Sequence, residues 1–131
     1  MTSTSSPRQI PETVASANDL ATLAALRDAL GDDVLQELLN AGFANVDQRC
    51  EELQAASRQS NWPKAADIAL DIADKIANLG FRSVAGAARS FAAATCENVD
   101  PHMLRNGAQM VVFEFERLRL GIGLQMPELL V

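Results

Sequence analysis

Apolar residues recur every three or four positions along most of this chain, a spacing typical of helices that bury one face. The pattern predicts a short helix that Asn18 or Asp19 caps, followed by a break at Gly31. A long helix is then expected over residues 33–57. The inward positions of the short helix are Leu20, Leu23, Ala24 and Leu30, and those of the long helix are Leu35, Leu38, Gly42, Val46, Cys50 and Leu53.

Turn signals separate three further helices. Asn61 and Pro63 favour a helix start, and Gly80 favours the end of the same helix, which we expect over residues 63–79. A fourth helix is expected over residues 83–96. Asp100 and Pro101 begin a fifth, whose inward residues are Leu104, Ala108, Val111, Phe115, Leu118 and Ile122.

These elements predict an all-α protein, with four helices in an antiparallel up-down bundle and an extra short helix at the N-terminus. Only 5% of the residues are aromatic, and alanine and leucine dominate, which favours close helix packing. We expect a flexible leader over residues 1–16, a helical bundle over residues 17–124 and a short tail over residues 125–131, which Gly121, Gly123 and Pro127 set apart.

The net charge of the chain argues against two classes of partner. A formal net charge of −6 leaves no basic stripe to neutralise phosphates, so nucleic acid and anionic membranes are not expected partners. No apolar run approaches the roughly 20 residues that span a bilayer, and no targeting signal is recognised, so we expect a cytoplasmic protein. Cys50 and Cys96 are interpreted as small buried residues in a reducing compartment.

The sequence contains few groups that could carry catalysis. The single histidine, His102, lies beside Pro101 in the first turn of the last helix, where a solvated surface role is expected. Asp67, Asp71 and Asp74 share part of one helix and are interpreted as a solvated face. We therefore expect no enzymatic activity, no cofactor and no metal site.

The helix over residues 63–79 has a second, unusual face. At about 100° per residue, its core side comprises Ala65, Ile68, Ala69, Ile72, Ile76 and Leu79. The opposite side comprises Ala66, Asp67, Leu70, Ala73, Asp74 and Ala77. Two interpretations stay open for this side: the first helix or the leader covers it, or it is a docking surface for another protein.

The segment that contains this helix resembles the motif of histidine phosphotransfer (Hpt) domains. Asn61-Trp62 matches the beginning of the family motif, Ala69 matches the alanine before the phosphoaccepting histidine, and Ala77-Asn78-Leu79-Gly80 matches its close. The helical order over residues 19–120 is similar to that of the family in a weaker sense. The resemblance implies an Hpt-like bundle fold and partners in two-component signalling.

The same alignment implies that phosphotransfer is lost. Leu70 stands where the family has its histidine, Ala73 where it has a lysine, and Asp74 where it has a glycine. Lys75 lies one position later, about 100° around the helix, and does not replace the missing lysine. A leucine offers no nitrogen to attack or hold a phosphoryl group.

The sequence therefore predicts a non-catalytic, Hpt-like signalling protein that binds a receiver domain or a histidine kinase and modulates a phosphorelay. Its expected partner-binding residues are Ala66, Asp67, Leu70, Ala73, Asp74, Ala77 and Asn78. One alternative is an oligomerisation module that also uses a second apolar stripe on the last helix, formed by Met103, Met110, Phe113 and Leu120. A true phosphocarrier that works through His102 is the remaining alternative.

Overall fold

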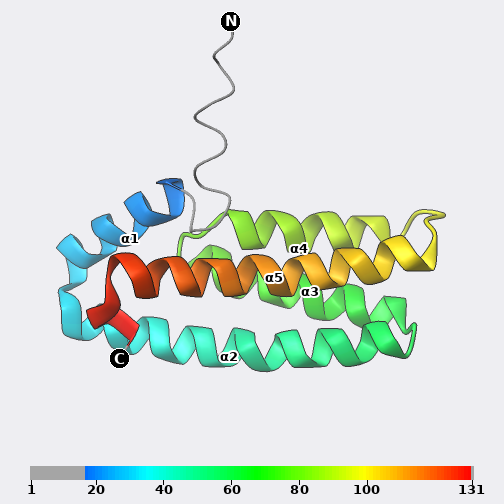
Figure 1. The fold of residues 1–131 in the computed structure, drawn as a ribbon, viewed down its shortest axis with the longest axis horizontal. Coiled ribbons are helices and arrows are strands. Elements are labelled where there is room, and N and C mark those ends of the chain that lie inside the picture. Colours follow the sequence, from blue (N-terminus) through cyan, green and yellow to red (C-terminus); the bar gives the residue numbers. More distant parts are fainter. Residues whose placement is uncertain (1–16, 131) are drawn as a thin grey trace, which may run out of the picture.

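A computed structural model describes residues 17–130, and over this range the chain is all-helical, as predicted (Figure 1). The prediction of a leader over residues 1–16 lies outside the described residues. The helices are α1 (Ala17–Leu30), α2 (Asp32–Arg58), α3 (Trp62–Asn78), α4 (Ser83–Ala94) and α5 (Pro101–Gln125), followed by the short 3₁₀ helix η2 (Pro127–Leu130).

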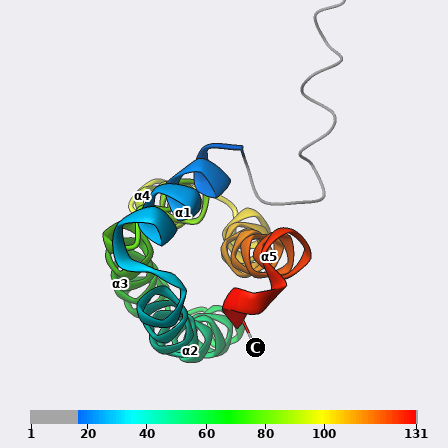
Figure 2. The same cartoon turned by 90° about the vertical axis from the view of Figure 1, so that its left-hand side faces the viewer.

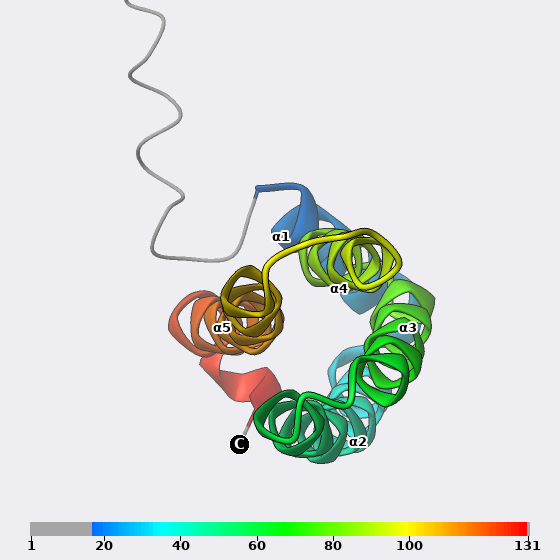
Figure 3. The same cartoon turned by 90° about the vertical axis from the view of Figure 1, so that its right-hand side faces the viewer.

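Helices α2 to α5 lie side by side around one core. Each packs on the next in chain order, and α5 returns to pack on α2. Seen along their length in Figures 2 and 3, the four helices form a ring in which α3 and α5 lie diagonally opposite. The chain reverses direction at each connection between them, and α1 lies across one end of the ring (Figure 1).

Local capping accounts for where α3 and α5 begin. The Asn61 side chain accepts a hydrogen bond from the Lys64 backbone N–H at 3.4 Å, and Pro63 occupies the first turn, where its missing N–H is not needed. The Asp100 carboxylate accepts from the His102 N–H at 2.8 Å. Both predicted starts are confirmed to within a residue.

Gly80 ends α3 in the manner that the sequence predicts. Its φ of +91° is the left-handed conformation that favours glycine, and its N–H donates to the Ala77 carbonyl at 2.8 Å. The Phe81 N–H donates further back to the Ile76 carbonyl at 3.2 Å. These two bonds satisfy carbonyls that the helix end would otherwise leave unpaired.

The core follows the predicted stripes most closely in α3 and α5, whose predicted inward residues are all buried. In α2 the prediction was partly wrong, because Leu38 is exposed and Gly42 is half-buried. Leu39 and Phe43 are buried instead. The helix is rotated so that its inward line passes through Leu35, Leu39, Phe43, Val46, Cys50 and Leu53.

The C-terminal segment differs from the expected short tail. Helix α5 continues through Gly121 and Gly123 to Gln125, because two glycines weaken a helix without breaking one that is packed. After the turn at Met126, η2 contacts both α2 and α5. Leu129, expected in the tail, is fully buried and belongs to the core.

A buried carboxylate of α1 bonds to the start of α4, a contact that the sequence did not predict. Asp19 was predicted as a possible cap of its own helix, but α1 already begins at Ala17. The Asp19 carboxylate is buried and accepts hydrogen bonds from the Arg82 backbone N–H at 3.0 Å and the Ser83 hydroxyl at 2.6 Å. It therefore caps α4, whose own N-cap residue Arg82 makes no side-chain cap.

The two cysteines lie in different environments. Cys50 is buried in α2 as predicted, but Cys96 is exposed just after the end of α4, so the prediction of a buried Cys96 is wrong. Both are free thiols. Within the described range, none of the helices combines the length and the apolarity that a membrane crossing requires.

Candidate protein-binding face

Helix α3 places Leu70 near its middle, on the side turned away from the core. The helix is flanked by α2 on one side and α4 on the other, which leaves only a narrow outer strip in contact with solvent. Leu70 keeps 45% of its surface exposed, a large fraction for a leucine in the middle of a packed helix. This side chain is the centre of the candidate face.

The predicted partner-binding residues do not all lie on that strip. Asp67, Leu70, Asp74 and Asn78 are exposed, and they define what we call the α3 face. Ala66 and Ala77 are half-buried at its edge and pack against the core.

Ala73 is a correction, because it is fully buried. It lies about 60° around the helix from Leu70, and packing on two neighbouring helices widens the buried arc of α3 to include it. The surface is consequently less alanine-rich than the sequence predicts. It is one leucine among two carboxylates and an amide.

An arginine of α2 forms ion pairs beside Leu70. The Arg49 guanidinium in α2 donates to the Asp71 carboxylate at 2.8 Å and also pairs with Glu52. Lys75 lies 3.6 Å from the second Asp71 oxygen. Partial burial lowers the pKa of Arg49, but the bonds to Asp71 and Glu52 outweigh this and leave its pKa raised.

Asp71 is thereby neutralised, whereas Asp67 and Asp74 take part in no ion pair within the described part of the chain. The sequence did not single out Arg49, because its partner lies 22 residues away. The α3 face therefore presents an apolar centre with net negative charge around it.

Helix α1 does not cover this face. It packs on α2 at one end of the ring and reaches the connection between α3 and α4, where Thr22 lies beside Gly80. Leu70 stays exposed, so the interpretation in which the first helix buries it is wrong for α1. The same interpretation for the leader concerns residues outside the described range.

His102 lies on α5, diagonally across the ring from α3 (Figures 2 and 3). Its side chain is exposed and lines a hollow with residues of α2 and α5, among them Arg58 and Arg105. It therefore does not belong to the α3 face. Within residues 17–130, His, Cys, Asp and Glu side chains form no group of three suited to a metal ion.

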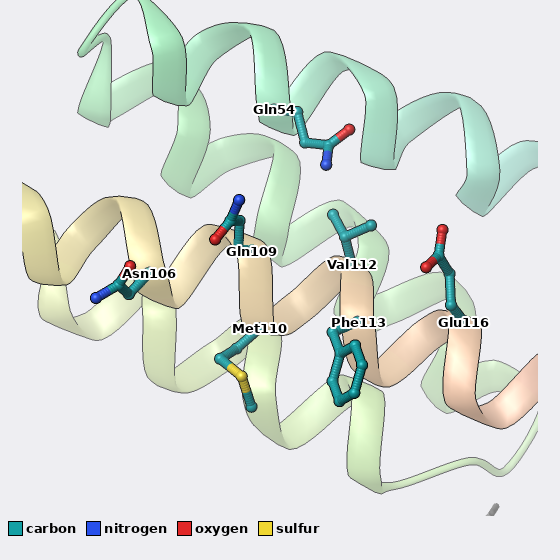
Figure 4. A pocket seen from close by; sticks show the side chains of 7 residues that line it. All are labelled: Gln54, Asn106, Gln109, Met110, Val112, Phe113 and Glu116. Atoms are coloured by element: carbon teal, nitrogen blue, oxygen red, sulfur yellow. The ribbon is translucent and has the colours of Figure 1, made fainter. Parts of the chain in front are cut away.

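A second surface runs along α5. Met103, Met110, Phe113 and Leu120 are exposed as the sequence predicts, and Leu124 extends their line. Beside them, a hollow of about 520 Å³ opens between α2 and α5. Figure 4 shows Gln109, Val112 and Glu116 on the side of α5 toward Gln54 of α2, with Met110 and Phe113 pointing away from α2. The sequence did not predict this hollow, because it forms only where two distant helices meet.

Comparison of the chain with protein-family models, with curated proteins and with solved structures finds no match.

Proposed function

We propose that this chain is a non-catalytic, Hpt-like signalling protein whose antiparallel four-helix bundle presents the α3 face to a two-component partner. The partner is a receiver domain or a histidine kinase, and the protein modulates phosphorelay signalling by occupying it. The observation that carries the proposal is the exposure of Leu70, at the position where the Hpt motif places its phosphoaccepting histidine.

The chemistry of the face supports binding over phosphotransfer. Leu70 has no nucleophilic atom, and a phosphoryl group beside it would lie near the carboxylates of Asp67 and Asp74. The same carboxylates favour a partner with basic or amide groups around an apolar depression. A leucine that enters such a depression contributes apolar burial, which is the usual source of affinity at the centre of an interface.

The experiment is a titration of the full chain with purified receiver and kinase domains, followed by calorimetry. We expect one of them to bind wild type, and Leu70→Arg to weaken that binding at least tenfold, because a guanidinium in an apolar contact is costly. Val34→Arg is the matched control. Val34 is an exposed apolar residue in the first turn of α2, outside the residues that define the α3 face, and its substitution should leave the affinity unchanged.

Equal binding by wild type and Leu70→Arg would contradict the role of the α3 face. If no two-component domain binds, the proposed signalling function is wrong. Mass spectrometry after incubation with a phosphorylated receiver adds a separate test. We expect no phosphoryl group on the chain. A phosphoryl group on His102 would establish the phosphocarrier alternative instead.

A further inference from the structure

The exposed side of α5 carries a regular apolar seam. Its positions are Met103, Asn106, Met110, Phe113, Arg117, Leu120 and Leu124, separated by alternating steps of three and four residues. This is the heptad spacing with which one helix packs along another. The core residues of α5 lie on the opposite side of the helix, so the seam is a second apolar face that is separate from the core.

The apolar members of the seam are unusually open. Met103, Met110, Phe113, Leu120 and Leu124 each expose between 49% and 64% of their surface. Asn106, Met110 and Phe113 also border the hollow between α2 and α5, while Met103 and Met110 line a second, smaller hollow of about 270 Å³ toward α4. The seam is thus a ridge with a depression on each side. Ridges and grooves of this kind are the surface on which the side chains of another helix pack.

We propose that the occupant of this seam is the α5 helix of a second copy of the chain, packed antiparallel about a two-fold axis. The reason lies in the spacing. From Met103 to Met110, Phe113 and Leu120 the steps are seven, three and seven residues, which is the same in both directions. A two-fold axis between Val111 and Val112 therefore brings each of these four residues level with another of them.

In this register Met103 lies level with Leu120 of the second copy, and Met110 lies level with Phe113. The two polar members of the seam, Asn106 and Arg117, also lie level with one another. Neither polar side chain then faces an apolar layer, where it would lose hydrogen bonds to water. Arg117 keeps its bond to Glu114 of its own helix, at 3.0 Å, and its guanidinium lies 5.7 Å from the centre of the Phe113 ring.

Charge along the α2 side of the seam agrees with self-pairing. Two chains of net charge −6 repel, so a second copy is accommodated only where carboxylates are kept apart. On the α2 side the seam is flanked by Gln109 and Glu116, which line the same hollow. The register places an amide near the partner's carboxylate, and it separates the two Glu116 side chains by nine residues, or about 14 Å along the helix.

The first test is the mass of the full chain in solution by light scattering across a concentration series. We expect twice the mass of one chain for wild type, and a monomer for Phe113→Glu, with dimer affinity lowered at least about 100-fold because two unpaired carboxylates would be buried at each interface. Leu70→Glu is the matched control, since Leu70 is similarly exposed but on α3, and it should remain dimeric. Circular dichroism checks that each variant is folded.

The second test concerns the register. In a Cys96→Ser background, a chain with both Met103→Cys and Leu120→Cys should form a covalent dimer on mild oxidation, whereas either single cysteine should not. Buried Cys50 does not interfere. A monomer at every concentration, dissociation by Leu70→Glu, or equal cross-linking by Met103→Cys alone would overturn the proposal. Because the α3 face and the α5 seam lie on diagonal helices, failure here leaves receiver binding through Leu70 unaffected.

Discussion

At the scale of single residues, burial sets the reactivity of the two thiols. Burial first, and then the nearby carboxylates of Asp47 and Glu116, raise the pKa of Cys50 to about 12. The thiolate is the reactive form of cysteine, so Cys50 should be inert near neutral pH. Exposed Cys96 does not have this protection.

We expect excess iodoacetamide at pH 8 to add one group to the folded chain, on Cys96, and two groups in denaturant, as counted by intact mass. The unfolded Cys50 thiol ionises near pH 9 and the folded one near 12, so its burial stabilises the fold below pH 9 and this contribution is lost as the pH rises toward 12. Labelling of Cys50 in the folded chain would contradict the prediction.

Gly80 is required for two separate reasons, its positive φ and its contact with α1. A Cβ at this position would lie 2.5 Å from Cγ2 of Thr22, so the added methyl group must shift the Thr22 side chain of α1 as well as strain the turn. We expect Gly80→Ala to lower the free energy of unfolding by about 1–3 kcal/mol in urea denaturation.

Gly86 is the matched control for that substitution. It is exposed inside α4, and a Cβ there meets nothing within 4 Å. Gly86→Ala should raise the free energy of unfolding by about 0.5–1 kcal/mol, because alanine loses less backbone entropy in a helix. An equal effect of both substitutions would show that the left-handed turn and the Thr22 contact do not matter.

At the scale of elements, the joint between α1 and α4 depends on one buried carboxylate. Asp19→Ala removes the acceptor for the Arg82 N–H and the Ser83 hydroxyl together. We expect a loss of about 1–3 kcal/mol in the free energy of unfolding, the usual cost of a lost cap with a part-buried donor left unpaired. Hydrogen exchange should quicken at the start of α4.

Asp28→Ala provides the comparison, because Asp28 is an exposed acidic residue on the same helix. Its effect should stay within about 0.5 kcal/mol. If the two substitutions destabilise equally, net charge and not the cap of α4 explains the result.

At the scale of the whole molecule, η2 closes the core at the end where α2 begins and α5 ends (Figure 1). Leu129 is fully buried there although it lies within three residues of the C-terminus. We expect Leu129→Ala to lower the free energy of unfolding by about 2–4 kcal/mol, as for other fully buried leucines. Leu124→Ala, on the exposed side of α5, should cost less than about 1 kcal/mol in dilute solution. Similar losses for both would contradict the placement of η2 in the core.

The sequence by itself determined the helices and most of their inward faces. Asn61, Gly80 and Asp100 act on neighbours within a few residues, so their effect is visible without the fold. The stripes of α3 and α5 could be predicted because a face that is buried along a whole helix repeats with the helical period. The exposure of Leu70 on α3 and of the four predicted apolar residues on α5 follows from the same period.

Only the tertiary structure decided features that depend on which helices are neighbours. Ala73 is buried because α3 has a helix on each side, and Leu129 is buried because the chain turns back after α5. Asp19 caps a helix 63 residues away, and Arg49 neutralises Asp71 from another helix. Such contacts join residues that no local period relates, so they form when the core is assembled.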